Sequence, residues 1–206
     1  VSTDILATVN NQKVAVLNTS AGPFISFSCK GAVEIQLTFN EQKDKLNIAP
    51  FSLGMTPEVI GNKVTVKING PVKFALMSDR TPVLYVYANP MPSNVPDPSD
   101  PKVKYFKAGQ IYEIGELHLH DNETLYLEGG AVVKGSVMAV SASNVTISGF
   151  GVLDGSYYNM SDRHRSIIFE DCRNSLIQDI TMIEPTAWMI VLGICENITV
   201  SNVKQL

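Results

Sequence analysis

The densest polar run of the sequence is Asp162-Arg163-His164-Arg165. Guanidinium groups bind carboxylates and sulfates through two parallel hydrogen bonds, and a histidine beside them adds a further donor. The run therefore has the residue types needed to bind an anionic group of a ligand. The same composition is also common in an ordinary exposed loop, so both interpretations stay open.

Two further residues are candidates for ligand contact. Trp188 is the single tryptophan and follows Pro185-Thr186-Ala187 in a stretch predicted to be extended. An indole there serves either as a flat platform for a ligand or as core packing. Asp154 stands before Gly155 at a predicted corner of the chain, but Asp-Gly is foremost a turn pair.

The elements that must position these residues are short repeated strands. Leu125–Gly129 superposes on Val145–Gly149 with a shift of 20, which also takes Val132 to Val152 and Gly135 to Gly155. Asn144, Asn174 and Asn197 then mark equivalent positions at shifts of 30 and 23. Periods of this length predict a solenoid of parallel strands. Its core is predicted to contain stacked aliphatic side chains, namely Val145, Ile147, Ile177, Ile198 and Val200.

The inserted run at Asp162–Arg165 falls in the residues that lengthen one repeat to 30. A loop inserted into a solenoid tends to lie on its binding face.

The same register puts Cys172 and Cys195 at equivalent positions, each two residues before a repeated asparagine. We expect a buried stack of free thiols there rather than a disulfide or a metal pair, because in-register parallel neighbours seldom have disulfide geometry.

The front half of the chain is predicted to be a mostly antiparallel β-sandwich over residues 32–87. Ala32–Phe39 alternates apolar and polar residues with a period of two, as a half-buried strand does. Val64–Ile68 and Val72–Leu76 flank Asn69-Gly70, which predicts a β-hairpin. Val83–Tyr87 is the last strand of the series.

A change in composition divides the chain. Residues 89–101 contain five prolines, which excludes a helix or an interior strand. We expect a sandwich at residues 1–90, a proline-rich linker at 91–103 and parallel coils at 104–206, although a long loop within one domain is the alternative.

Composition excludes several classes of function. The net charge is −4 and the pI is near 5.4, so no basic field attracts nucleic acid or an anionic membrane. No run approaches the 18 or so apolar residues of a membrane span. The three cysteines are too few and too scattered for a disulfide framework or a zinc site, so no metal and no cofactor is expected. Asn-x-Ser/Thr sequons occur at Asn18, Asn122, Asn144, Asn159 and Asn197, which leaves glycosylation open.

The second half of the sequence resembles a known enzyme family. Tyr105–Gly109 and Asp121–Gly135 resemble the entry coils of pectin-type glycoside hydrolases, and Ile147–Gly155 looks like the stretch that opens the polygalacturonase helix. Arg165–Cys172 and Ile183–Ile190 look like the two coils that follow. The resemblance is to glycoside hydrolase family 28, over residues 104–206. A sandwich ahead of such a helix is also similar to family 49, the dextranases and isopullulanases.

These resemblances imply an all-β fold, with an N-terminal β-sandwich followed by the first coils of a right-handed parallel β-helix of the pectin-lyase type. They also imply a secreted or periplasmic hydrolase of a polysaccharide, acting through two aspartates without a cofactor. Family 28 places its acids in Asn-Thr-Asp, Asp-Asp and Gly-His-Gly segments, and none of these occurs here. We therefore expect the catalytic residues, and the rest of the helix, to lie beyond Leu206.

Within this chain, the resemblance leaves substrate contact as the expected role of Asp154, Arg163, His164, Arg165 and Trp188. The arginines suit a uronate carboxylate, and Trp188 suits stacking against a sugar ring. The substrate is an oligosaccharide or polysaccharide. A non-catalytic β-helix that binds carbohydrate, such as an adhesive rod, is the alternative from another class. A polysaccharide lyase is disfavoured, because no acidic calcium-binding cluster is evident.

Overall fold

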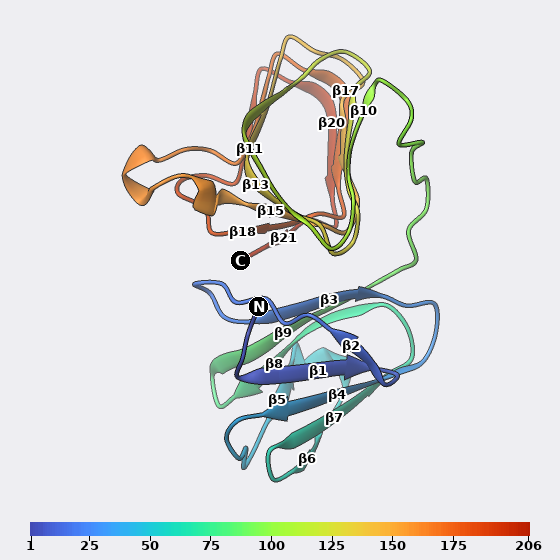
Figure 1. Cartoon of the computed structure of the whole chain (residues 1–206), viewed down its shortest axis with the longest axis vertical. Helices are drawn as coiled ribbons and strands as arrows, with labels where there is room; N and C mark the ends of the chain where they lie inside the picture. The colour runs from blue at the N-terminus through green and yellow to red at the C-terminus, as the bar shows by residue number, and fades with distance from the viewer. The chain divides into compact units, whose positions relative to one another are not determined.

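The computed structural model describes all 206 residues, which divide into two units, Val1–Met91 and Pro92–Leu206 (Figure 1). Each unit is described by itself. Helical structure is confined to three single-turn 3-10 helices: η1 (Phe51–Leu53), η2 (Gly155–Tyr157) and η3 (Met160–Asp162).

The first unit is a sandwich of two β-sheets. Its strands are β1 (Ile5–Val9), β2 (Gln12–Val14), β3 (Phe24–Ser28), β4 (Val33–Phe39), β5 (Asn47–Ala49), β6 (Glu58–Ile60), β7 (Lys63–Ile68), β8 (Val72–Ser78) and β9 (Thr81–Asn89). One sheet has the order β2-β1-β4-β7-β6 and the other β3-β9-β8-β5. Every pair is antiparallel except β3 with β9. The alternation in β4 buries Ile35, Leu37 and Phe39 in the core between the sheets.

The predicted hairpin at Asn69-Gly70 is wrong. Strand β7 pairs with β4 and β6, whereas β8 lies in the other sheet and pairs with β5 and β9. The physical reason is Pro71. A two-residue hairpin closes with a hydrogen bond from the residue after the turn, and proline has no N–H to donate. The Asn69-Gly70 pair therefore carries the chain from one sheet to the other.

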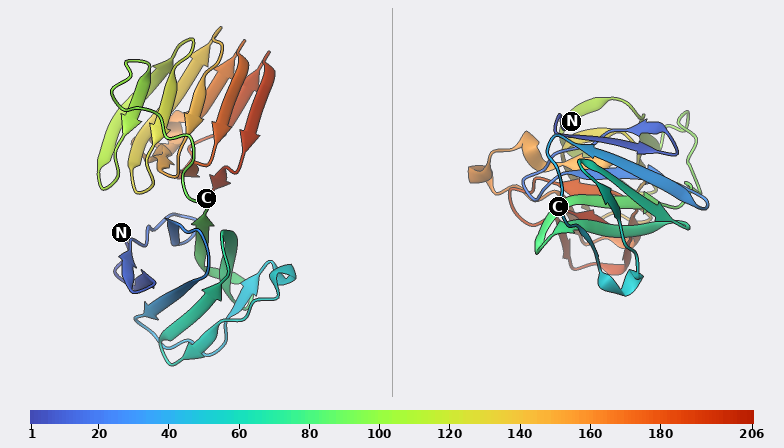
Figure 2. Two further views of the ribbon diagram at one scale, coloured as in Figure 1. Left: turned by 90° about the vertical axis from the view of Figure 1, so that its right-hand side faces the viewer. Right: turned by 90° about the horizontal axis from the view of Figure 1, so that it is seen from below.

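The second unit consists of parallel strands in stacked coils (Figure 2, left). Its strands are β10 (Val103–Phe106), β11 (Ile111–Leu119), β12 (Thr124–Leu127), β13 (Val132–Val140), β14 (Thr146–Ser148), β15 (Val152–Asp154), β16 (Ile167–Glu170), β17 (Arg173–Gln178), β18 (Thr181–Ile183), β19 (Ile190–Gly193), β20 (Glu196–Ser201) and β21 (Lys204–Gln205). One sheet runs β10-β12-β14-β17-β20. The other runs β19-β16-β13-β15-β18-β21, with β11 also on β13. The predicted sandwich and parallel β-helix are confirmed.

The repeat register is right at three steps and wrong at one. Val132 pairs with Val152, Thr146 with Leu176 and Ser175 with Ile198, which are the predicted shifts of 20, 30 and 23. Leu125, however, pairs with Ile147, a shift of 22 rather than 20.

The two-residue error has a cause in the next turn. Four residues separate Leu127 from Val132. On the next coil Gly149 corresponds to Leu127, and only two residues separate it from Val152. Gly149 has φ +105°, and a Cβ there would lie 2.1 Å from the Leu127 carbonyl oxygen. Only glycine permits this tight corner.

The aliphatic rows fill the interior of the coils. Val145, Ile147 and Ile177 are fully buried, as predicted, and Ile198 is partly buried. Val200 was predicted to be buried as well, and this is wrong, because it is 42% exposed. Val200 pairs with Ile177 and so belongs to the predicted row. It is exposed because β20 is the outermost strand of its sheet and no further strand covers it.

Cys172 and Cys195 are free thiols, as predicted, but the predicted burial is right only for Cys172, because Cys195 is partly exposed. The Cys172 thiol donates to the carbonyl oxygen of Ala139 at 3.4 Å, and the Cys195 thiol to that of Phe169 at 3.3 Å. Ala139 and Phe169 are themselves paired between adjacent coils, so each thiol bonds back to the preceding coil. Burial raises the pKa of the Cys172 thiol, which keeps it protonated as a donor.

Candidate functional site

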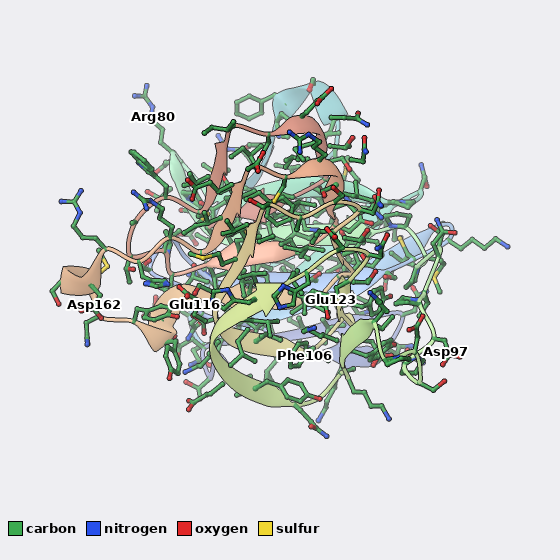
Figure 3. All side chains as sticks on the ribbon, turned by 90° about the horizontal axis from the view of Figure 1, so that it is seen from above. Arg80, Asp97, Phe106, Glu116, Glu123 and Asp162 are labelled. Atoms are coloured by element: carbon green, nitrogen blue, oxygen red, sulfur yellow. The ribbon has the colours of Figure 1, made fainter.

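The inserted loop, residues 155–165, stands out from the coils between β15 and β16 (Figure 1). It contains η2 and η3 and accounts for the longest step of the repeat. Asp162 lies out on this loop, whereas Glu116 lies over the sheet (Figure 3). The loop thus brings its side chains to the outer face of the sheet that contains β11, β13, β16 and β19.

Asp154 fixes the start of the loop. Its Oδ1 accepts a hydrogen bond from the Ser156 N–H at 2.8 Å and caps η2, and the residue is only 7% exposed. The following Gly155 is packed so tightly that a Cβ would lie 2.5 Å from the Glu184 carbonyl oxygen. The carboxylate of Asp154 is therefore part of the turn, in keeping with its Asp-Gly sequence.

The tip of the loop is held by its own capping bonds. Asp162 Oδ2 accepts from the Asn159 N–H at 2.9 Å in a capping box around η3. Arg163 ends η3 in the left-handed region, with φ +48°, and is exposed. Its guanidinium has no ion pair, so it is free to meet an anion from solvent.

His164 anchors the loop to the sheet. Its Nε2 lies 2.9 Å from the Ser136 hydroxyl and 3.3 Å from Glu116 Oε2, and its ring stacks on Tyr158 at 3.9 Å. Its backbone is held too, since the Thr186 hydroxyl accepts from the His164 N–H and donates to the His164 carbonyl, each at 3.0 Å. The histidine predicted as a ligand contact is thus largely committed to structure.

Glu116, Ser136, Tyr158 and His164 together form what we call the anchor cluster. Ser136 is 2% exposed and also bonds the Tyr158 hydroxyl at 3.0 Å. Burial raises the pKa of the Tyr158 phenol, and the nearby charge of Glu116 raises it further, against an opposing contribution from the Ser136 bond. Glu116 also pairs with His118 at 2.9 Å. A buried hydroxyl under a stacked Tyr–His pair is not accessible to a substrate.

Sequence reasoning missed three members of this cluster. Glu116 and Ser136 are direct neighbours in the β11–β13 ladder, so extending the repeat to β11 would have paired them. A β-bulge at Ile114 shifts this ladder just before Glu116, and Gly115, an isolated glycine in the strand with φ +59°, is the sequence signal that marks it. Tyr158 is 22 residues from Ser136 and meets it only through the loop.

Trp188 and Arg165 are the exposed part of the site. Trp188 is 68% exposed, and the Arg165 guanidinium carbon lies 5.6 Å from the centroid of its ring. The two residues come from adjacent coils, joined by a hydrogen bond from the Ser166 N–H to the Trp188 carbonyl oxygen at 3.2 Å. Core packing, the alternative for Trp188, is excluded by this exposure. The indole presents a flat apolar face beside a cation.

The five predicted residues thus fall into two groups. Arg163, Arg165 and Trp188 are exposed, with Arg165 over the Trp188 ring. His164 anchors the loop to the sheet, and Asp154 caps the turn at the loop's base. The carboxylates of Asp154, Asp162 and Glu116 are each engaged in a structural bond. No group of three or more His, Cys, Asp or Glu side chains is placed to hold a metal ion. No helix here has the length and apolar character of a membrane span.

Comparison with known proteins gives the fold. No family profile and no curated protein sequence matches the chain. Among solved structures, Dex49A from Penicillium minioluteum aligns with 100% of this chain at a TM-score of 0.75 and 14% identity. This chain has the fold of the matched part of Dex49A.

A protein from Parabacteroides merdae, provisionally described as a glycosyl hydrolase, aligns with 48% of this chain at a TM-score of 0.44 and 23% identity. The alignments cover 58% of Dex49A and 57% of the Parabacteroides protein.

Proposed function

We propose that this chain is the substrate-contacting first part of a polysaccharide hydrolase, and that its outer face at Trp188 and Arg165 holds the sugar chain. The observation that carries the proposal is the 68% exposure of Trp188 with a guanidinium over its ring. An exposed indole costs hydration free energy unless a ligand covers it, and sugar rings present the flat C–H faces that stack on indole.

The type of hydrolase is part of the proposal. Dex49A matches both the sandwich and the coils, which is the arrangement that the sequence resemblance assigns to family 49. We therefore favour a dextranase-type or isopullulanase-type enzyme over a polygalacturonase-type enzyme. We also propose that the protein is secreted or periplasmic, because polymeric substrates of this kind are met outside the cytoplasm.

Catalysis itself is assigned to no residue of this chain. Glycoside hydrolysis needs an acid and a base or nucleophile facing one bond. Asp154 and Asp162 are caps, and Glu116 bridges two histidines, so none of them presents a free carboxyl toward Trp188. In the proposal the catalytic pair belongs to further coils of the whole protein, consistent with the chain matching 58% of Dex49A.

Affinity electrophoresis tests this function. The chain is run in gels containing dextran, pullulan or polygalacturonate, alongside Trp188→Ala and a matched control, Phe51→Ala. Phe51 is an aromatic residue of the other unit that is 79% exposed. We expect retardation in at least one gel, with an affinity that falls at least about tenfold in Trp188→Ala and is unchanged in Phe51→Ala. Equal retardation of all three proteins, or none, would contradict the proposal.

A binding protein without catalysis is the second candidate. It is favoured by the engagement of Asp154, Asp162 and Glu116 in structural bonds. Measuring new reducing ends on the same polysaccharides separates the two, when the complete gene product is compared with this chain. Hydrolysis by the complete product but not by this chain supports the enzyme, and binding without hydrolysis by either supports the alternative.

A further inference from the structure

The sandwich unit has a groove of its own, at the end where its two sheets separate. The groove has a volume of about 490 Å3 and lies between the start of β1 and the end of β4 on one side and the starts of β3 and β9 on the other. That volume falls within the range of roughly 300–1,000 Å3 found for small-molecule sites. Neither the comparisons nor the proposed function assigns any role to it.

The floor of the groove is apolar. Phe39, from the end of β4, is 4% exposed, and Pro23, Pro82 and Val83 line the groove with it. The two prolines lie at the starts of β3 and β9, where a missing N–H leaves no unpaired donor toward the groove. Rigid, partly buried rings and a valine make a surface that suits C–H groups rather than water.

The rim of the groove carries both hydrogen-bond donors and hydrogen-bond acceptors. The Asn40 amide nitrogen donates to Asp4 Oδ1 at 3.2 Å and to the Thr3 carbonyl oxygen at 3.5 Å, which fixes a carboxylate and an amide side by side. The Lys43 ammonium lies 5.1 Å from the centroid of the Phe39 ring, and Glu41 stands between Asn40 and Lys43 in sequence. Carboxylate and amide oxygens that accept and an ammonium that donates match the vicinal hydroxyls of a sugar, each of which can donate and accept.

The charges decide which kind of sugar fits. Asp4 and Glu41 contribute two negative charges and Lys43 one positive charge, so the rim has a net charge of −1. A polyanion such as polygalacturonate is repelled by this balance, whereas a neutral glycan is not. We propose that the groove is an accessory binding site for a short stretch of neutral polysaccharide, separate from the face at Trp188.

The site is tested on the full chain by NMR, with isotope-labelled protein and three probes: isomaltotriose, maltotriose and the galacturonic acid trimer. We expect at least one neutral trisaccharide to shift the backbone amides of residues 39–43 and 83, with an affinity of about 1 mM or tighter. We expect the acidic trimer to leave these amides unchanged at the same concentration.

The variants are chosen in an exposed loop so that the sandwich core is untouched. Asn40→Ala combined with Glu41→Ala is expected to weaken the groove shifts at least about fivefold, and Glu41→Ala alone to weaken them less. Glu58→Ala, an exposed carboxylate of β6, is the matched control and should change nothing. Trp188→Ala should also leave the groove shifts intact, which separates this site from the proposed function. Absence of shifts at residues 39–43 with both neutral probes, equal shifts with the acidic trimer, or full binding by the double variant would overturn the proposal.

Discussion

The His164 imidazole and the Ser136 hydroxyl lie 2.9 Å apart, which joins an inserted loop to a strand 28 residues earlier in the chain. Ser136 is almost fully buried, and His164 keeps a partly exposed ring that also meets Glu116. The bond therefore holds the loop against the sheet and leaves Arg163, Arg165 and Trp188 facing solvent. Rigid support of exposed groups is what a binding face requires.

Replacing His164 with Ala should release the loop without unfolding the coils. The variant loses the contacts to Ser136 and Glu116 and the stacking on Tyr158, which together contribute about 1–3 kcal/mol. Hydrogen exchange of the amides of residues 156–163 should accelerate at least about fivefold, with strands β13 and β16 unchanged. Arg163→Ala, next to it and exposed, is the control. Unchanged exchange in His164→Ala would show that the anchor cluster does not hold the loop.

Truncating the side chains of the aliphatic row that contains Ile147, Ile177 and Val200 should lower the free energy of unfolding by amounts that follow their burial. Ile147→Ala and Ile177→Ala remove fully buried side chains and should lower the free energy of unfolding by about 2–5 kcal/mol. Val200→Ala, in the same row but 42% exposed, should cost less than about 1 kcal/mol. Hydrogen exchange of the amides of β14 and β17 measures the free energy of unfolding of this unit. Equal costs at the three positions would contradict the register.

Gly149→Ala should be among the most damaging single changes in the coils. An added Cβ meets the Leu127 carbonyl oxygen at 2.1 Å, and the φ of +105° is strained for any L side chain. We expect a loss of about 3 kcal/mol or more. Gly31→Ala is the matched control, because no atom lies within 4 Å of a Cβ there and its φ is not positive. Thermal unfolding measures both variants, and a mild effect at Gly149 would disprove the tight corner.

Much of the fold could be predicted from the sequence, because repeats of apolar and asparagine positions recur at measurable spacing. The asparagine ladder illustrates this: Asn197 donates its amide to Asn174 at 2.7 Å, one coil away. The errors arose where a distant residue decided the outcome. Pro71 removed a donor from an apparent hairpin turn, and Gly149 shortened a corner by two residues.

The site was predicted only in part. The exposed pair of Arg165 and Trp188 could be chosen by residue type, since an indole suits stacking on a sugar ring and a guanidinium suits an anionic group. The anchor cluster could be predicted only for Glu116 and Ser136, which an extended repeat pairs, because His164 and Tyr158 reach them only through the loop. Residue type alone did not show that Asp154 caps a turn rather than facing a ligand.

The sandwich unit should lose stability at alkaline pH through Tyr87. Burial raises the pKa of its phenol from 10 to about 12, with the charge of Tyr85 adding to the effect. The folded state thus keeps the phenol neutral after the unfolded state ionises it, so the stabilisation is complete below pH 10. It is lost progressively between about pH 10 and 12, and amounts to roughly 2 kcal/mol.

Comparing unfolding of the natural chain and Tyr87→Phe at several pH values isolates this contribution, because all other groups titrate in both proteins. Between pH 9 and 12 the natural chain should lose about 2 kcal/mol more unfolding free energy than Tyr87→Phe does. Parallel pH profiles for the two proteins would mean that Tyr87 ionises freely in the folded sandwich.

Titration of Trp188 fluorescence with dextran-derived and pullulan-derived oligosaccharides tests the central claim most directly. Trp188 is the single tryptophan and is 68% exposed, so its emission reports on the proposed face alone. Stacking of a sugar ring should remove water from the indole and give a saturable blue shift, and Arg165→Ala should weaken it about threefold to tenfold. Emission that stays constant up to saturating concentrations of every oligosaccharide, in a protein that is retarded by the same polysaccharides, would show that sugar binding lies elsewhere and contradict the account.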